Sequence, residues 1–234
     1  MSVKVSPLNY ADHGHLKIKA INNYEHVNAQ QVLPVVVHEF SAAAAEMPVV
    51  FVKNAETGEF QSVAILGFKP GENLFYNENK WQGTYIPAYA THHPFALIPS
   101  ENDENQLRVA FSESSLLVSE KEGNALFDDK GNETEYMENR KKALGNYYEN
   151  THVTKVFTKV LTDMALLVEQ SLSLELNGEK MNISGVYLIN ETKLNELSDV
   201  NFLELRKKGF LSPIYSHMGS LRQLKNLAQL KTAK

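Results

Sequence analysis

The chain has 234 residues, of which 43% are hydrophobic and 22% are charged, a composition typical of a globular protein. It contains no cysteine, which excludes disulfides, iron–sulfur clusters, cysteine nucleophiles and thiolate zinc sites. The net charge of −5 argues against nucleic-acid binding, because that binding needs lysine and arginine to neutralise the phosphates.

The sequence carries no pattern of export or membrane insertion. Met1–His13 lacks a basic segment followed by an apolar one, and no apolar run approaches the roughly eighteen residues of a membrane-spanning helix. We therefore expect a cytoplasmic protein without a transmembrane segment. Because no repeat or linker divides the chain, we also expect a single domain over residues 1–234.

Strand patterns dominate the first part of the chain. His15–Ile21 alternates apolar and basic residues, and Val32–Phe40 is an apolar run that Pro34 restricts to an edge or to a strand start. Ser41–Glu46 predicts a short helix, since serine suits its cap and alanine has the highest helix propensity.

The densest apolar alternation lies between Pro48 and Pro99. Val49–Val52 and Ser62–Phe68 predict two strands covered on both faces, and the polar segment Asn54–Glu59 between them predicts a hairpin loop. Asn73–Tyr76 predicts a further strand after a turn.

A long helical pattern follows the short predicted strand Gln106–Phe111. Apolar residues recur at helical spacing over Thr134–Val168. We expect two helices with a break near Asn150, because Thr151 suits the cap of the second helix.

The remaining chain predicts a hairpin and three short helices. The strands Ser171–Leu176 and Lys180–Ile189 flank Asn177-Gly178, which suits a type I′ turn. The helix starts are Asn190 or Thr192 for the first, Ser198 for the second and Ser212-Pro213 for the third.

These elements together predict an α+β fold. We expect a mostly antiparallel sheet from residues 15–111 and 171–189. A long central helical segment at 134–168 and a C-terminal cluster of short helices at 190–230 would pack around it.

The common catalytic and phosphate-binding motifs are absent. There is no Gly-x-Gly-x-x-Gly, Walker loop, Gly-x-Ser-x-Gly or His-Glu-x-x-His, and no histidine is followed two places later by an acid. We therefore expect no cofactor and no tightly bound metal. His13-Gly-His15 is either a partial metal site or a surface pair.

Two further histidine positions leave alternatives open. His92 and His93 are adjacent, so they point apart on most backbones, and one buried and one exposed histidine is the structural alternative to a site. His38-Glu39 is either an acid–base pair or a pair satisfied within the fold.

Aromatic residues indicate a candidate ligand pocket. Trp81, Tyr85 and Tyr89 could line one, with a small core under a long loop as the alternative.

A C-terminal helix could complete this pocket. Tyr215, Gly219 and Arg222 share a face of that helix, which we expect to lie toward Trp81 and Tyr85. There Arg222 would clamp the carboxylate of a peptide or small acidic metabolite. The alternatives are tight helix packing at Gly219 and a surface ion pair of Arg222.

Charge is unevenly distributed along the chain. Residues 101–139 hold 11 acids and 3 bases, whereas residues 205–234 hold 7 bases and no acid. These stretches are either solvated faces or partners of each other, within the fold or across a subunit contact such as that of a homodimer.

Several motifs in one order resemble the bacterial SapC family, over roughly Pro7 to Leu230. The motifs are Pro48–Phe51, Ala64–Gly67, Gly71–Phe75, Trp81–Pro87, His93–Phe95, Leu126–Asp128, Ser212–His217 and Ser220–Leu224. The family is named after a surface-layer-associated protein, and it is distinct from a transport permease of similar name. It carries no agreed catalytic residues that could be transferred to this chain.

The resemblance implies a non-catalytic accessory protein. Members of the family accompany TonB-dependent receptors and enzymes that resemble tryptophan halogenases and cupin oxygenases, so a peptide- or metabolite-modification and uptake system is implied. The alternatives are an enzyme with an unrecognised site, around His38, His92, His93 and His217, and a surface-layer component that would need unconventional export. The residues predicted for ligand or partner binding are Trp81, Tyr85, Tyr89, His92, His93, Tyr215, His217, Gly219 and Arg222.

Overall fold

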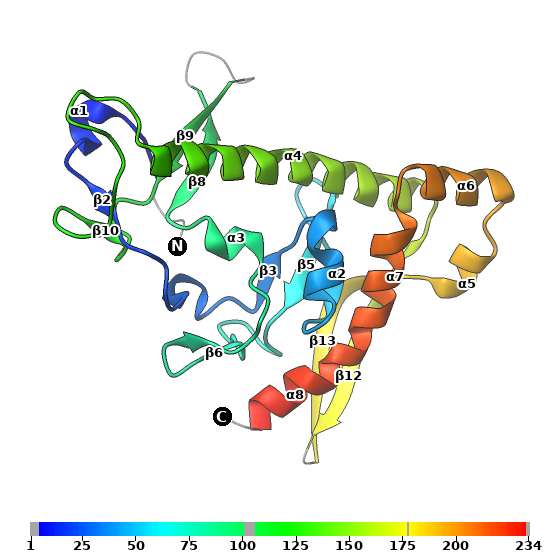
Figure 1. Ribbon diagram of the computed structural model, residues 1–234. Helices are drawn as coiled ribbons and strands as arrows, with labels where there is room; N and C mark the ends of the chain where they lie inside the picture. The colour runs from blue at the N-terminus through cyan, green and yellow to red at the C-terminus, as the bar shows by residue number, and fades with distance from the viewer. Residues whose placement is uncertain (1–4, 101–105, 177, 233–234) are drawn as a thin grey trace. The chain divides into compact units, whose positions relative to one another are not determined.

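The structure is a computed structural model that describes residues 5–100, 106–176 and 178–232 (Figure 1). Contacts between residues divide the chain into two compact units. Unit 1 comprises residues 1–23 and 90–149, and unit 2 comprises residues 24–89 and 150–234. The prediction of one domain over residues 1–234 stays a prediction.

Unit 1 is built on two small antiparallel sheets and the first part of a long helix, α4 (Glu135–Asp163). The first sheet has the order β1 (Ser6–Pro7), β9 (Leu107–Phe111), β8 (Phe95–Pro99). The second has the order β10 (Val118–Ser119), β2 (Lys17–Ile18), β11 (Asn124–Ala125). The buried core residues are Ile18, Phe95, Phe111, Leu126, Phe127, Met137 and Leu144.

Unit 2 is built on a five-stranded antiparallel sheet. Its order is β12 (Leu167–Leu176), β13 (Glu179–Ile189), β4 (Val49–Lys53), β5 (Phe60–Ile65), β3 (Val32–Pro34). The second part of α4 packs on this sheet through Phe157, whose ring centroid lies 6.2 Å from that of Phe51 on β4. Val49, Val50 and Phe51 are fully buried, so β4 is covered on both faces as its apolar run predicts.

The other elements of unit 2 are short. They are η1 (Glu25–Val27), η2 (Val37–Glu39), α2 (Phe40–Ala43), the strand pair β6 (Tyr76–Asn77) and β7 (Lys80–Trp81), α5 (Glu191–Asn195), α6 (Asp199–Lys207), α7 (Leu211–Ser220), η3 (Leu221–Gln223) and α8 (Leu224–Thr232). Two further helices are α1 (Tyr10–His13) in unit 1 and α3 (Ala88–Thr91) at the boundary between the units.

The predicted α+β class is confirmed, and every strand pairing among the described residues is antiparallel. The strands that the structure describes form four sheets, however, where the sequence predicted one. His15–Ile21 contributes only the two residues of β2 to a sheet.

The predicted strand Val32–Phe40 is wrong beyond Pro34. The side chain of Glu39 accepts a hydrogen bond from the backbone N–H of Val36, and this bond closes a tight turn in place of a ladder. The same kind of local bond replaces the predicted strand at Asn73, whose side chain accepts from the N–H of Phe75 and donates to the carbonyl of Val27.

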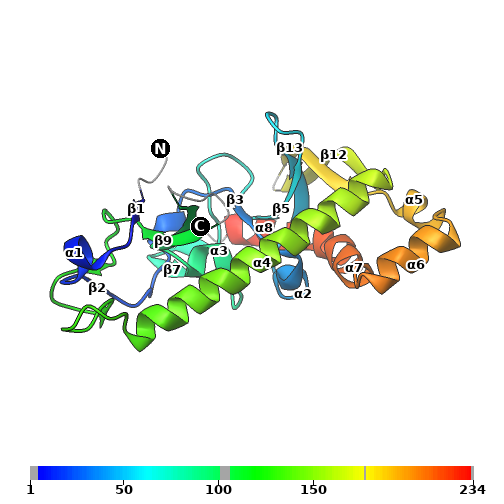
Figure 2. The ribbon, with the colours of Figure 1, turned by 90° about the horizontal axis from the view of Figure 1, so that it is seen from above.

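The predicted break at Asn150 is also wrong, because α4 is a single helix of 29 residues (Figure 2). Thr154 and Thr162 donate their hydroxyls to the carbonyls four residues earlier, at 2.7 and 2.8 Å, so these polar side chains are satisfied without leaving the helix. The helix ends at Asp163, and Leu167 begins β12.

The C-terminal helix starts were predicted in part. Asn190 accepts from the N–H of Lys193, and Ser198 accepts from the N–H of Asn201, so both cap their helices as expected. Ser212 is not a cap, because α7 begins one residue earlier, at Leu211.

The hairpin of β12 and β13 is confirmed, whereas the predicted turn residue Asn177 lies outside the described residues. The strand register shifts between Gln170 and Leu172, where Ser184 and Gly185 face one residue of β12. Gly185 has a φ of +72°, the left-handed conformation that such a bulge places on glycine.

We expect Gly185→Ala and Gly219→Ala to change stability in opposite directions. A methyl group at either position meets no atom within 4 Å, so the backbone conformation alone determines the effect on stability. Alanine at 185 should lower the free energy of unfolding by about 1–2 kcal/mol, because left-handed backbone is costly for it. Alanine at 219, in α7, should raise it by up to about 1 kcal/mol. Urea unfolding measures both, and a destabilised Gly219→Ala variant would contradict this account.

Candidate functional site

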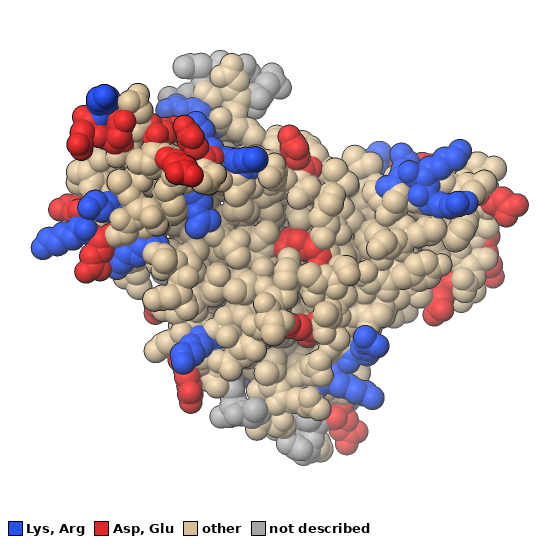
Figure 3. All heavy atoms as spheres, viewed as in Figure 1, with Lys and Arg blue, Asp and Glu red and all other residues tan. Residues whose placement is uncertain are grey.

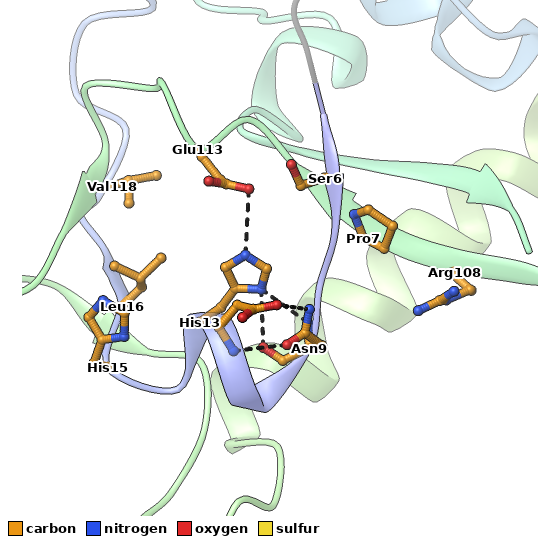
Figure 4. Close-up of a pocket in the computed structure, with 10 residues that line it drawn as sticks. Ser6, Pro7, Asn9, His13, His15, Leu16, Arg108, Glu113 and Val118 are labelled. Atoms are coloured by element: carbon orange, nitrogen blue, oxygen red, sulfur yellow. Dashed lines mark hydrogen bonds and ion pairs between the residues drawn. The ribbon is translucent and has the colours of Figure 1, made fainter.

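The candidate site is a pocket of about 640 Å³ in unit 1 (Figure 4). Its walls come from β1 and the turn after it, from α1, from β9 and the turn that follows, and from β10. The polar side chains at the pocket include His13, His15, Arg108 and Glu113. Sequence reasoning had singled out only the two histidines, as a surface pair or partial metal site.

The turn into α1 fixes the position of His13. Asn9 caps this helix by accepting from the N–H of Asp12 at 2.9 Å, and its side-chain amide donates to the Asp12 carboxylate at 2.9 Å. The backbone N–H of Asn9 donates to Nδ1 of His13 at 3.1 Å. The ring packs edge-on against Phe111, with centroids 4.9 Å apart, so His13 is buried and held from two sides.

The other nitrogen of His13 faces an acid. Its Nε2 lies 3.6 Å from a carboxylate oxygen of Glu113, and Figure 4 shows the two side chains pointing toward each other. Its Nδ1 lies 3.1 Å from both the N–H and the carbonyl oxygen of Asn9, so either tautomer of the ring has a backbone partner there. The Glu113 side chain is 52% exposed and lies in the lining of the pocket.

Arg108 brings a positive charge to the same pocket. It lies on β9, and its side chain is half-buried. Within the part of the chain that the structure describes, no acidic side chain forms an ion pair with it. The pocket therefore holds a guanidinium and a carboxylate at separate positions.

The two histidines lie near different carboxylates. His15 is exposed and lies 3.9 Å from Glu120, whereas His13 lies against Glu113. No group of three or more histidine, aspartate or glutamate side chains with metal-binding geometry occurs among the described residues.

A model of the SapC family matches residues 8–227, which is almost the whole chain. The chain belongs to the SapC family. No curated protein and no solved structure matches it significantly. In this SapC-family chain, none of the helices that the structure describes is long and apolar enough to cross a membrane.

Of the predicted site residues, Trp81 belongs to a packed aromatic cluster. Its ring stacks on Phe75 with centroids 5.6 Å apart, and Tyr24 packs against it edge-on at 6.1 Å. Its indole N–H donates to the carbonyl of Tyr85 at 2.9 Å. These contacts favour the alternative of a small core under a long loop. Tyr89 is exposed on α3.

Two carboxylates anchor the loop that carries Tyr85. Glu39 accepts from the Tyr85 hydroxyl and, at 2.7 Å, from the N–H of Ala88. Glu46 accepts from the N–H of Thr84 at 2.9 Å. Glu39 is buried and its carboxylate is satisfied within the fold by these bonds, whereas its neighbour His38 is exposed.

His92 and His93 lie in unit 1 and face different partners. His93 Nε2 lies 2.8 Å from the Ser115 hydroxyl. The His92 ring lies 4.9 Å from that of Tyr147, and its buried Nδ1 has no hydrogen-bond partner among the described residues. Burial, and secondarily the charge of Arg140, lowers the pKa of His92, so its ring favours the neutral form.

The face of Tyr215, Gly219 and Arg222 points to solvent. All three residues are exposed, and no hydrogen bond, ion pair or ring contact between described residues joins Arg222 to Trp81. The alternative of tight packing at Gly219 is wrong, because an added methyl group there meets no atom within 4 Å. Their joint role in partner binding stays a prediction.

His217 lies on the opposite, buried face of α7. Its Nδ1 lies 2.7 Å from the carbonyl of Val49, to which it donates, and its Nε2 accepts from the N–H of Ile189 at 3.1 Å. Both nitrogens thus bind backbone groups of β4 and β13. This histidine ties α7 to the sheet and has no nitrogen left for a ligand.

A second surface feature lies on α6. Val200 and Leu203 are exposed there, and Figure 3 shows lysine and arginine side chains gathered over this helix, where Arg206, Lys207 and Lys208 lie.

We expect His217 to make stability depend on pH. Burial lowers its pKa to about 4, against 6.5 in the unfolded chain, although donation to Val49 opposes this shift. Between pH 6.5 and 4 the unfolded state therefore binds a proton that the folded state does not. The free energy of unfolding should fall by up to about 3 kcal/mol as the pH is lowered through this window.

The measurement compares urea unfolding of the wild type and His217→Gln from pH 7 to pH 4. The variant should be less stable at pH 7 and should lose less stability on acidification. His38→Gln, at an exposed position, is the control and should keep the wild-type slope. Equal slopes for wild type and His217→Gln would contradict the assignment.

Proposed function

We propose that this protein is a non-catalytic binding protein that takes a small acidic molecule, a peptide or an acidic metabolite, into the pocket of unit 1. The observation that carries the proposal is Arg108, a guanidinium at the pocket that has no ion-pair partner among the described residues. A guanidinium binds a carboxylate through two parallel hydrogen bonds, which gives both affinity and orientation.

The size and lining of the pocket support this ligand class. A pocket of about 640 Å³ lies in the range typical of small-molecule sites. Pro7, Leu16 and Val118 contribute apolar surface beside the polar groups. A ligand with one carboxylate and a modest apolar part would match both the guanidinium and the apolar surface of the pocket.

The cellular role that we propose is that of an accessory protein in a peptide- or metabolite-modification and TonB-linked uptake system. Membership of the SapC family supports this role, because the resemblance implies such a setting. A protein partner within that system is part of the proposal. Association with a surface layer is the alternative role for the same binding protein.

An enzyme is the second candidate function. The observation that favours it is the distance of 3.6 Å between His13 Nε2 and Glu113, since a histidine oriented by a carboxylate is a common general base. The two functions differ in what leaves the pocket. A binding protein returns its ligand with unchanged mass, and an enzyme does not.

We expect a carboxylate probe such as succinate to bind the full chain and Arg108→Gln to weaken this binding about 10- to 100-fold, because hydrogen bonds to charged groups contribute about 1.5–3 kcal/mol. Isothermal titration calorimetry measures the affinity, and mass spectrometry of the recovered probe tests for turnover. Lys142→Gln, exposed on α4, is the matched control and should bind as the wild type does. Arg108-independent binding would refute the proposed site.

A further inference from the structure

We propose that the outer edge of β12 binds an extended segment of a partner protein, in which apolar residues alternate with lysine or arginine. Through backbone hydrogen bonds, this segment joins the five-stranded sheet of unit 2 as an added strand. The surface lies in unit 2, so the inference goes beyond the proposed function and does not depend on the pocket of unit 1.

The two edges of this sheet differ. β12 forms one edge and β3 the other. β3 has three residues and ends with Pro34, which has no backbone N–H, so it offers little to a further strand. β12 has ten residues and contains neither proline nor lysine, the two residues that commonly protect an edge strand. β13 pairs with β4 at Val186 and Tyr187, and the rest of the β12–β13 hairpin extends beyond β4 (Figure 1).

One hydrogen bond shows which backbone groups of β12 face outward. The N–H of Asn190 donates to the carbonyl of Leu166, so Leu166 faces β13. Residues that face the neighbouring strand alternate with residues that face away, and the extra residue of the bulge lies on β13, so the alternation of β12 continues past it. The N–H and C=O groups that face away therefore belong to Leu167, Glu169, Ser171, Ser173 and Glu175. Among the described residues, no hydrogen bond joins these backbone groups to another segment.

The side chains of β12 define the chemistry of the added strand. Glu169, Ser173 and Glu175 are exposed on one face, and β12 contains no basic residue. Leu172 and Leu174 are half-buried on the other face. Neighbouring residues on adjacent strands share a face. A matching strand therefore places bases beside the two glutamates and apolar side chains beside the two leucines.

The contacts of the two glutamates within the hairpin leave this edge acidic. Glu169 accepts from the hydroxyl of Tyr187 at 3.3 Å, which is a neutral partner. Lys180 is opposite Glu175 in the register, but no ion pair joins them among the described side chains. A basic strand gains charge complementarity at both positions.

A second copy of β12 fits this edge less well. Antiparallel self-pairing centred on Leu172 brings Glu169 opposite Glu175, and every other register also joins two strands that carry acids and no base. Like charges directly opposite each other destabilise a sheet. The charge of the edge therefore favours a basic partner segment over self-association.

The test uses isothermal titration calorimetry on the full chain with the peptide acetyl-Lys-Val-Thr-Val-Thr-Val-Lys-amide. Its lysines have the same spacing as Glu169 and Glu175, and its sequence reads the same in both directions, so it suits either strand orientation. We expect it to bind at least about 10-fold more tightly than two control peptides. One carries glutamate in place of both lysines, which reverses the charge. The other carries proline in place of the central valine, which removes a backbone donor and disfavours the strand.

Variants of the chain separate the backbone contribution from the charge contribution. Ser173→Pro removes an outward N–H without removing a bond to β13, and it should weaken binding at least about 10-fold. Ser173→Ala is the matched control, because it loses the same side-chain bond to Asn182 but keeps the N–H, and it should bind as the wild type does. The double variant Glu169→Gln and Glu175→Gln should bind about 3- to 10-fold more weakly, as expected for two exposed ion pairs.

Two further controls test for indirect effects. Glu56→Gln removes an exposed acid between β4 and β5 and should leave the affinity unchanged. Thermal unfolding monitored by circular dichroism shows whether each variant is folded. If Ser173→Pro does not fold, the comparison of the lysine peptide with its proline control on the wild type decides the backbone contribution.

Three results would overturn the inference. The first is no binding of the lysine peptide at up to about 1 mM. The second is equal binding of the lysine peptide and either control peptide. The third is a wild-type dimer in light scattering that Ser173→Pro converts to a monomer, because the edge would then belong to a second copy of the chain.

Discussion

A single helix closes the hydrophobic cores of both compact units. Met137 and Leu144 of α4 are buried in the core of unit 1, while Phe157 and Leu161 are fully buried in unit 2. Burying one such side chain contributes about 1.5–3 kcal/mol, so neither core is complete without its part of α4. The helix is continuous through Asn150, and the hydroxyls of Thr154 and Thr162 in its second half bind carbonyls of the same helix.

Buried polar side chains then fix the segments that regular structure leaves unpaired. Backbone N–H groups in loops must find acceptors when they are buried. Glu39 accepts hydrogen bonds from the N–H groups of Val36 and Ala88. His217 donates to the carbonyl of Val49 and accepts from the N–H of Ile189. Glu39 and His217 are residue types that are common in catalytic sites, but in unit 2 their side chains stabilise the fold. Selecting candidates by residue type alone therefore pointed toward them.

How much the sequence predicts depends on the range of the interactions. The β4–β5 and β12–β13 hairpins and the caps Asn190 and Ser198 follow from neighbouring residues, and they were predicted. The turns at Glu39 and Asn73 depend on side-chain bonds that compete with a strand, and no periodicity reveals them. The alternative of a small core at Trp81, Tyr85 and Tyr89 was considered, but the packing around Trp81 depends on Phe75 and Tyr24, which apolar spacing alone does not bring together.

The candidate site could not be predicted from the sequence either, because it also depends on contacts between distant parts of the chain. Its residues come from the first sixteen positions and from positions 108–118, and only the fold makes them neighbours. A local signal did exist in Asn9-x-x-Asp12, a capping pattern directly before His13, and it would have predicted that this histidine ends a helix turn. It would not have predicted Arg108 or Glu113, whose role depends on tertiary contacts.

Arg108 is half-buried and has no ion pair with an acidic side chain among the described residues. The half-buried Lys231, by contrast, pairs with Glu72 at 2.6 Å. A guanidinium that is partly removed from water without an acidic partner in the described chain loses solvation and gains no ion pair in return. Folds depart from such consistency mainly where function requires it. A ligand carboxylate would restore the balance at Arg108 and would explain why the chain places an arginine at that wall of the pocket.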